Sequence, residues 1–244
     1  MIMEEIKNCN TTKCSTALWN KRRKGRVPVI TDIKIKSPGE GDLILARDPV
    51  LLAENLEAAG VPVISVVTEV EHYGGSPELL YNIAKVVSVP ILRKDFIDNR
   101  DQLKETVEIG ASGVLLIASM LEKNQLFKLV EESLFLGLEP LVETHNEAEM
   151  TLARELNPTF LGINNRNIIE LETDNGNVNT TEKLAALASK EALLVSESSI
   201  SSKEDVSRAI SAGAHAVLIG TAILKSKDPV QTYKNFSELL GDEL

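Results

Sequence analysis

The sequence predicts an α/β fold in which eight strands, each followed by a helix, form one closed barrel. Short β-branched apolar runs alternate eight times with amphipathic segments along the 244 residues. Strands that are apolar along nearly their whole length are typical of a parallel sheet covered by helices. Eight such units in a chain of this length fit a (β/α)8 TIM barrel better than an open doubly wound sheet.

An internal similarity supports the same fold. The segment 110–117, GASGVLLI, is echoed by the segment 213–220, GAHAVLIG. These segments contain the fourth and eighth predicted strands, so the echo falls at half-barrel spacing. No linker or low-complexity stretch interrupts the pattern. We therefore expect a single domain, with a short N-terminal extension at residues 1–27 and the barrel at residues 28–244.

The elements follow one another in a regular order. The predicted strands are 29–35, 63–68, 90–94, 113–117, 139–142, 160–164, 193–196 and 216–219. The predicted helices are 49–59, 76–87, 100–109, 122–136, 146–156, 180–188, 202–212 and 229–239. Asp48 and Asp228, each followed by proline, are typical N-caps for the first and last of these helices. Four glycines stand where a helix should end before a strand: Gly60, Gly110, Gly137 and Gly213.

The overall charge is strongly negative. The formal net charge is −10 and the sequence pI is near 5.0. Such a field repels nucleic acid and anionic lipid, so neither is an expected partner. The basic run at residues 21–24 is interpreted as a solvated segment ahead of the first strand. An anionic small-molecule substrate would need a local cationic or amide-lined pocket.

Cysteine and histidine positions give no sign of a metal site. Cys9 and Cys14 both precede the first predicted strand, and the three histidines are scattered far from them in sequence. Two free thiols in a reducing compartment is the simpler interpretation. The first residues contain no continuous apolar stretch, and no run elsewhere is long enough to cross a bilayer. We expect a cytoplasmic protein, a monomer or a weak homo-oligomer.

The first strand stops being hydrophobic toward its end. Because side chains alternate along a strand, Ile33 is expected to face the helices, whereas Asp32, Lys34 and Lys36 are expected to face the lumen. Charged side chains inside a barrel are costly unless they are paired or used. In barrels of this kind the chemistry gathers at the C-terminal ends of the strands.

Four further strands also end in charged or amide residues. These endings are Arg93-Lys94-Asp95, Glu143, Asn164-Asn165-Arg166 and Ser196-Glu197. One such residue alone is usually a structural ion pair, but several in succession favour an active site. Two acids and two amines side by side could serve as general acid and base: Asp32, Glu143, Lys34 and Lys94.

The last two strands predict a phosphate site. Ser198-Ser199 and Gly220-Thr221 follow strands seven and eight, where barrels commonly bind a phosphate with backbone N–H groups. Ser37, after strand one, could add a hydroxyl. A tight turn is an equally good interpretation of Gly220 taken alone.

Several blocks together resemble the indole-3-glycerol-phosphate synthase family. They are Asp32-Ile33-Lys34 continuing to Ser37-Pro38, and the segments 64–69, 92–96, 141–143, 162–166 and 196–198, in that family's order. The resemblance covers residues 27 to about 225. It implies conversion of 1-(2-carboxyphenylamino)-1-deoxyribulose 5-phosphate to indole-3-glycerol phosphate, carbon dioxide and water, in tryptophan biosynthesis. It also implies that neither a cofactor nor a metal is needed.

The resemblance further implies roles for individual residues. Lys94 is similar to the general acid, Glu143 to a proton-transfer residue in the dehydration, Asp32 to a catalytic carboxylate and Lys34 to the amine that pairs with the substrate carboxylate. The expected substrate-binding residues are Asn164, Arg166, Phe96, Tyr73 and Lys36. The expected phosphate-binding residues are Ser37, Ser198, Ser199, Gly220 and Thr221.

Several positions depart from the family's usual pattern: Gly39, Gly74 and Asn167 differ from it, and so do two residues of the expected site. Asp32 stands where glutamate is usual, and Ser199 stands where glycine is usual. A serine there would be strained if its φ had to be positive. Two alternatives therefore remain open: a related lyase acting on a different aryl-amine or sugar phosphate, and a catalytically weak barrel that binds a phosphorylated metabolite.

Overall fold

Eight parallel strands close into a barrel in the computed structural model, which describes residues 12–171 and 176–238. In ring order the strands are β1 (Val29–Ile33), β4 (Val63–Val67), β5 (Ile91–Lys94), β6 (Gly113–Ile117), β7 (Glu139–Thr144), β8 (Phe160–Asn164), β9 (Leu193–Glu197) and β10 (Ala216–Ile219). β10 pairs with β1 and closes the ring. The predicted TIM barrel is confirmed, and β6 and β10, which carry the internal echo, are its fourth and eighth strands.

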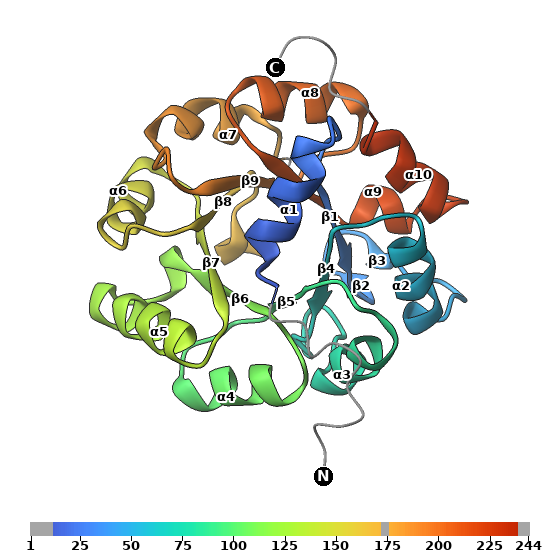
Figure 1. The fold of residues 1–244 in the computed structure, drawn as a ribbon, viewed down its shortest axis with the longest axis horizontal. Helices are drawn as coiled ribbons and strands as arrows, with labels where there is room; N and C mark the ends of the chain where they lie inside the picture. Colours follow the sequence, from blue (N-terminus) through green and yellow to red (C-terminus); the bar gives the residue numbers. More distant parts are fainter. Residues whose placement is uncertain (1–11, 172–175, 239–244) are drawn as a thin grey trace.

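A ring of helices surrounds the strands (Figure 1). They are α2 (Pro49–Ala58), α3 (Pro77–Val86), α4 (Arg100–Glu108), α5 (Lys123–Phe135), α6 (Glu147–Glu155), α7 (Asn179–Leu184), α8 (Lys203–Ser211) and α10 (Pro229–Phe236). The Asp48 and Asp228 side chains cap α2 and α10 as predicted. Residue 239, the predicted end of the last helix, lies outside the described residues. Among these helices none is long and apolar enough to span a membrane.

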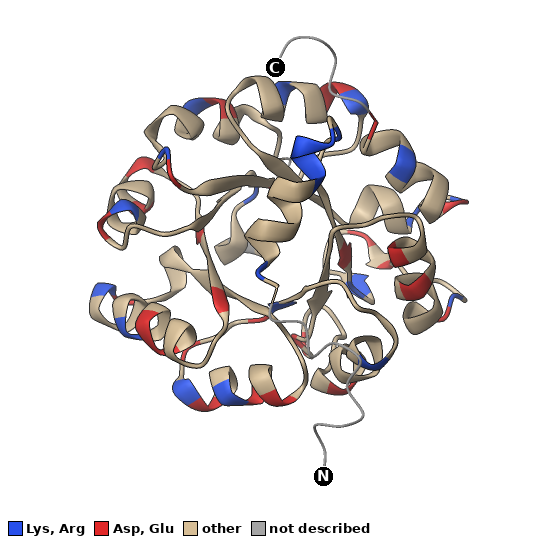
Figure 2. Cartoon of the chain, viewed as in Figure 1, with Lys and Arg blue, Asp and Glu red and all other residues tan. Residues whose placement is uncertain are grey.

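Lys, Arg, Asp and Glu residues lie mostly on this outer ring (Figure 2). The barrel interior is apolar over most of its height, because inward positions such as Ile30, Leu92 and Phe160 pack together in one cluster. Outward positions such as Val29 and Ile64 pack instead against the helices. This alternation confirms the predicted strand register and leaves only the rims of the barrel for polar chemistry.

An additional helix, α1 (Cys14–Arg23), closes the N-terminal end of the barrel and lies across the ring of strands in Figure 1. Its Cys14 and Leu18 are fully buried against the inward-facing residues. Its Ser15 donates hydrogen bonds from N (2.9 Å) and Oγ (2.5 Å) to the carboxylate of Glu139, at the start of β7. Among the described residues, α1 thus covers the N-terminal rim, and the cavities described below lie at the opposite, C-terminal rim. Cys9 lies outside the described residues.

The predicted first strand is too long, and this changes the position of Lys36. β1 ends at Ile33, and the chain then forms a small hairpin of β2 (Lys36–Ser37) and β3 (Gly41–Asp42). Other short elements were not predicted either, among them α9 (Thr221–Leu224) after β10 and the 3₁₀ turn η3 (Ala185–Leu187), which takes the end of the predicted helix 180–188.

Candidate active site

Four charged side chains form the top layer of the barrel interior. They come from alternate strands: Asp32 from β1, Lys94 from β5, Glu143 from β7 and Glu197 from β9. Alternate strands of such a barrel contribute side chains at the same height. Two residues earlier on the same four strands stand Ile30, Leu92, Leu141 and Val195, all in the buried apolar cluster. The charged layer thus rests directly on an apolar floor.

Lys94 stands between two buried glutamates. Its Nζ lies 3.4 Å from Glu197 Oε2 and 4.0 Å from Glu143 Oε2. Both glutamates are almost completely buried, at 0% and 1% exposure. Burial raises the pKa of Glu197 to about 8; Lys94 opposes this increase, while Glu143 and Asp32 add to it. The layer can therefore hold a proton near neutral pH, as acid–base chemistry requires.

Glu197 was not among the predicted site residues. The signal was present in the sequence, because Leu193 and Val195 face the lumen and the period of two places Glu197 on the same side. Gly162 on the neighbouring strand makes room for it, since a Cβ on that glycine would collide with the Glu197 carboxylate.

Asp32 is anchored from the second strand. Ser65 Oγ donates a hydrogen bond of 2.7 Å to Asp32 Oδ1. On the other side Gly220 packs closely, and a Cβ there would lie 3.1 Å from Asp32 Oδ2. Glycine at position 220 therefore lets the end of β10 pack tightly against Asp32. Lys34, two residues beyond Asp32, is also buried, and its Nζ lies 5.9 Å from the centre of the Tyr73 ring.

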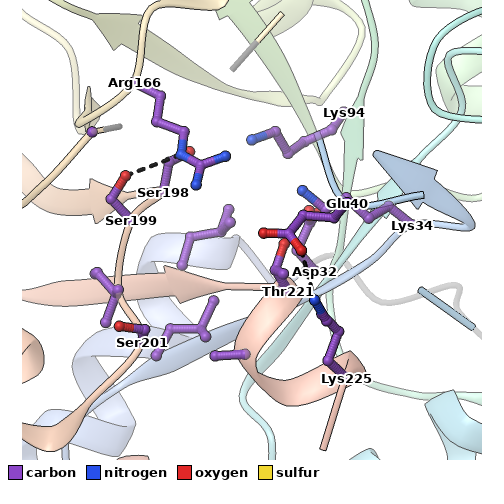
Figure 3. A pocket seen from close by; sticks show the side chains of 16 residues that line it. Asp32, Lys34, Glu40, Lys94, Arg166, Ser198, Ser199, Ser201, Thr221 and Lys225 are labelled. Atoms are coloured by element: carbon purple, nitrogen blue, oxygen red, sulfur yellow. Dashed lines mark hydrogen bonds and ion pairs between the residues drawn. The ribbon is translucent and has the colours of Figure 1, made fainter. Parts of the chain in front are cut away.

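Two cavities meet at this layer. The first, of about 290 Å³, is mainly polar; its lining includes Arg166, Ser198, Ser199, Gly220, Thr221 and Lys225 (Figure 3). The second, of about 40 Å³, is mainly apolar; its lining includes Val67, Tyr73, Phe96, Leu115, Ile117, Glu143 and Ile168. Asp32, Lys34 and Lys94 line both. An elongated ligand with a polar and an apolar end fits this arrangement.

The turn after β9 is strained at the predicted phosphate residues. Ser198 and Ser199 have φ values of +63° and +56°, in the left-handed region that favours glycine. Arg166 Nε donates a hydrogen bond of 3.1 Å to Ser199 Oγ (Figure 3). Gly176 permits this contact, because a Cβ there would lie 2.6 Å from Ser199 Oγ. The serine side chain thus lines the cavity without filling it.

The mouth of the polar cavity carries an ion pair that was not predicted. Lys225 Nζ lies 2.6 Å from Glu40 Oε2, and this hydrogen bond holds the pKa of Glu40 below its ordinary value (Figure 3). Glu40 belongs to the turn between β2 and β3, so the hairpin brings a carboxylate to the rim beside the cations.

Three predicted residues line neither of the two cavities. The expectation that Lys36 faces the lumen is wrong: in β2 its side chain is exposed, and its Nζ donates to the Glu71 carbonyl. Ser37 is buried in the hairpin and has no position on either cavity wall. Asn164 is buried at the end of β8, where its Oδ1 accepts a hydrogen bond from Arg166 N. The remaining predicted residues are brought together.

His145, a residue that the sequence did not single out, contacts the charged layer from behind. Its Nε2 lies 3.3 Å from Glu143 Oε1, and its Nδ1 lies 3.0 Å from Glu149 Oε2. Burial lowers the pKa of His145, but the two carboxylates outweigh it and raise that pKa to about 10.

Comparisons with known proteins agree with this geometry. A family model described as indole-3-glycerol phosphate synthase matches residues 4–236. The indole-3-glycerol phosphate synthase of Pyrococcus furiosus is 42% identical over 217 residues, covering 89% of this chain and 94% of that protein. That of Thermococcus kodakarensis is 41% identical over 218 residues (89% and 95%). That of Carboxydothermus hydrogenoformans is 40% identical over 231 residues (94% and 86%). The chain therefore belongs to the indole-3-glycerol phosphate synthase family.

Proposed function

We propose that the protein converts 1-(2-carboxyphenylamino)-1-deoxyribulose 5-phosphate to indole-3-glycerol phosphate, carbon dioxide and water, with the charged layer as its catalytic centre. One observation carries the assignment of the site: a polar and an apolar cavity share Asp32, Lys34 and Lys94 as a common wall. The substrate has the matching form, with a phosphate at one end, an aromatic ring at the other and the reacting carbons between them.

The two ends of the substrate are bound by different forces. The phosphate is bound in the polar cavity by Arg166, by the Ser198-Ser199 turn and by the segment Gly220-Thr221. The anthranilate ring enters the apolar cavity beside Tyr73 and Phe96, where burial of its surface favours binding. This cavity is small, so the aromatic side chains must move apart as the ring enters.

Ring closure needs a proton donor beside the ketone oxygen. The ring carbon that bears the carboxylate attacks the ketone carbon, and Lys94 protonates the oxygen as the new bond forms. Lys34 pairs with the substrate carboxylate and orients the ring for this attack. Carbon dioxide then leaves, which restores the aromatic ring. A proton donor fixed in place before the reaction contributes on the order of a hundredfold or more.

Dehydration follows at the same carbon. The hydroxyl formed in the first half accepts a second proton and leaves as water, and the neighbouring C–H loses its proton to complete the indole. Glu143 carries out proton transfer in this half. Glu197 holds Lys94 in place and shares its proton. Asp32, fixed by Ser65, supplies the remaining carboxylate next to the developing cation.

The shorter side chain of Asp32 favours one alternative, a related lyase with a different aryl-amine or sugar phosphate as substrate. The bond to Ser65 holds the carboxylate at the β4 side of the layer, and one methylene less than glutamate leaves extra room beside Lys94. Asp32→Glu distinguishes the two. Slower or unchanged turnover of the carboxyphenylamino substrate supports the proposal, and markedly faster turnover supports the alternative.

The direct test is a fluorescence assay. Purified protein with the carboxyphenylamino-deoxyribulose phosphate, and no added metal or cofactor, should develop indole fluorescence. Lys94→Ala should lose at least about a hundredfold in kcat, while its thermal unfolding midpoint stays close to that of the parent protein. Flat fluorescence with folded parent protein and authentic substrate would reject the function. Full turnover by Lys94→Ala would remove Lys94 from the mechanism.

Two further expectations belong to this proposal. The substrate carries a phosphate and a carboxylate, and so charged a molecule does not diffuse across a bilayer; we therefore place the reaction in the cytoplasm. A monomer or weak homo-oligomer remains the expected oligomeric state. The absence of a nucleic-acid partner and of any cofactor requirement remain predictions.

A further inference from the structure

A third cavity lies next to the catalytic layer and shares Arg166 with the polar cavity of the active site. It measures about 400 Å³, and its lining includes Ser119, His145, Glu149, Asn164, Arg166 and Asn167. Glu143 lines the small apolar cavity but not this one, whereas His145 lines this one but neither cavity of the active site. The imidazole of His145 therefore lies between Glu143 and the outer cavity.

The two ring nitrogens of His145 face different carboxylates. Nε2 is buried and lies 3.3 Å from Glu143 Oε1, on the catalytic side. Nδ1 lies 3.0 Å from Glu149 Oε2, on the side of the outer cavity. Glu149 also accepts a hydrogen bond of 2.8 Å from the backbone N of His145, which fixes the pair relative to each other. An imidazole held between two carboxylates can pass a proton from one to the other.

The proposed reaction needs such a supply of protons. The ketone oxygen takes up two protons to become water, and one proton is released from carbon as the indole forms. The carboxylate of the substrate leaves as neutral carbon dioxide, so each turnover consumes one proton from solvent. Glu143 is 1% exposed, and bound substrate would fill the cavities on its open side.

We infer that His145, backed by Glu149, is a positioning and proton-relay residue for Glu143, which it reloads from the outer cavity. The inference rests on the proposed function, because it assigns the source of the proton that Glu143 transfers. In each cycle the imidazolium gives its Nε2 proton to Glu143 and keeps its Nδ1 proton. A half-turn of the ring then exchanges the sides on which the two nitrogens lie, and the vacant nitrogen takes up a proton from the outer cavity through Glu149. The relay thus delivers one proton per cycle and breaks no bond between heavy atoms.

The charges around His145 agree with this role. Glu143 and Glu149 face its two nitrogens, Arg166 lines the same outer cavity, and Lys94 and Glu197 lie beyond Glu143. The two carboxylates raise the pKa of His145 to about 10 against the opposing effect of burial, which keeps the ring protonated at neutral pH. His145→Asn removes a cation beside Glu143, and a carboxylate that loses a neighbouring cation is more easily protonated.

The test is the pH dependence of His145→Asn and Glu149→Gln. For His145→Asn we expect kcat to fall roughly tenfold, less than the ~10² for a direct proton donor, with KM within about twofold. Because Glu143 acts here as a proton donor, the basic limb of the kcat profile should move to higher pH in His145→Asn and, by a smaller amount, in Glu149→Gln. His215→Asn is the matched control: this histidine lies at the closed end of the barrel, against Trp19, and its variant should keep the parent profile.

Chemical rescue separates a relay from a purely structural role. His145→Ala leaves a hole of imidazole size facing the outer cavity, so added imidazole should restore kcat. Methylated imidazoles should restore it in proportion to their basicity, which a packing effect would not produce. A parent-like pH profile in His145→Asn, or no rescue in folded His145→Ala, would overturn the inference. Full activity in Glu143→Gln would instead overturn the proposed role of Glu143.

Discussion

The two ends of the barrel use the same residue type in opposite ways. Glu139 and Glu143 stand four residues apart on β7, both face the lumen, and both are 1% exposed. At the closed end, Glu139 accepts hydrogen bonds from Ser15 N and Oγ, which are neutral donors of α1. At the open end, Glu143 faces two cations, Lys94 and His145, and lines a cavity.

This difference separates a structural carboxylate from a functional one. Neutral donors at fixed distances satisfy Glu139 and connect α1 to the barrel. Around Glu143 and Glu197 the layer instead keeps carboxylates close together, and the turn that follows β9 is strained at two serines. Such features lower stability and persist where they serve binding or catalysis. Variants of the open end should therefore lose activity at little cost in stability, and variants of the closed end should do the reverse.

The largest expected effect is a loss of activity in Glu143→Gln and a loss of stability in Glu139→Gln. Glu143→Gln should lose about a hundredfold in kcat, with its free energy of unfolding nearly unchanged. Glu139→Gln should lose about 1–3 kcal/mol of stability, because an amide NH₂ replaces one acceptor oxygen beside Ser15, and should keep kcat. Fluorescence assays and urea unfolding of both proteins measure the two quantities. Equal activity losses in both variants would break the comparison.

Prediction from the sequence was most successful where side chains alternate between the two faces along a whole strand. The ring of strands, the register of their side chains and most of the charged layer followed from alternation and from polar strand ends. Lys36 was misplaced because alternation was extended past Ile33, where β1 ends and the chain bends into the β2–β3 hairpin. No local pattern marks that end, since Ile35 continues the apolar alternation.

Contacts between distant segments could not be predicted in the same way. His145 becomes notable only because the start of α6 places Glu149 behind it, and Glu40 reaches the cavity only through a hairpin that pairs it with Lys225. The role of α1 as a cover for the closed end depends on Ser15 meeting Glu139, 124 residues away. Glu197 differs from these residues, because the alternation of side chains along β9 already predicts that it faces the lumen.

A smaller effect concerns the pH dependence of stability, which should come from the open end. The pKa of Glu197 is about 8 in the folded protein and near 4.5 when unfolded, so the folded state binds the extra proton. The stabilisation that this proton gives the folded state is fully present below pH 4.5 and is lost as the pH rises through about 8. Glu197→Gln cannot titrate, so its free energy of unfolding should fall less between pH 5 and 8, by about 3 kcal/mol in total. Parallel pH curves for the two proteins would place the titration elsewhere.

The smallest effect should come from the strained turn of the open end. Ser199 has a positive φ, so Ser199→Gly removes strain of about 1 kcal/mol but also removes the hydrogen bond to Arg166, worth a similar amount. Ser199→Ala loses that bond and keeps the strain. We therefore expect urea unfolding to rank glycine above alanine by about 1 kcal/mol, with the parent protein near the glycine variant. Both variants should raise KM modestly, because Arg166 is no longer held toward the phosphate. If alanine proved as stable as glycine, the backbone there would carry no strain, and the open end would differ from the closed end in its charges alone.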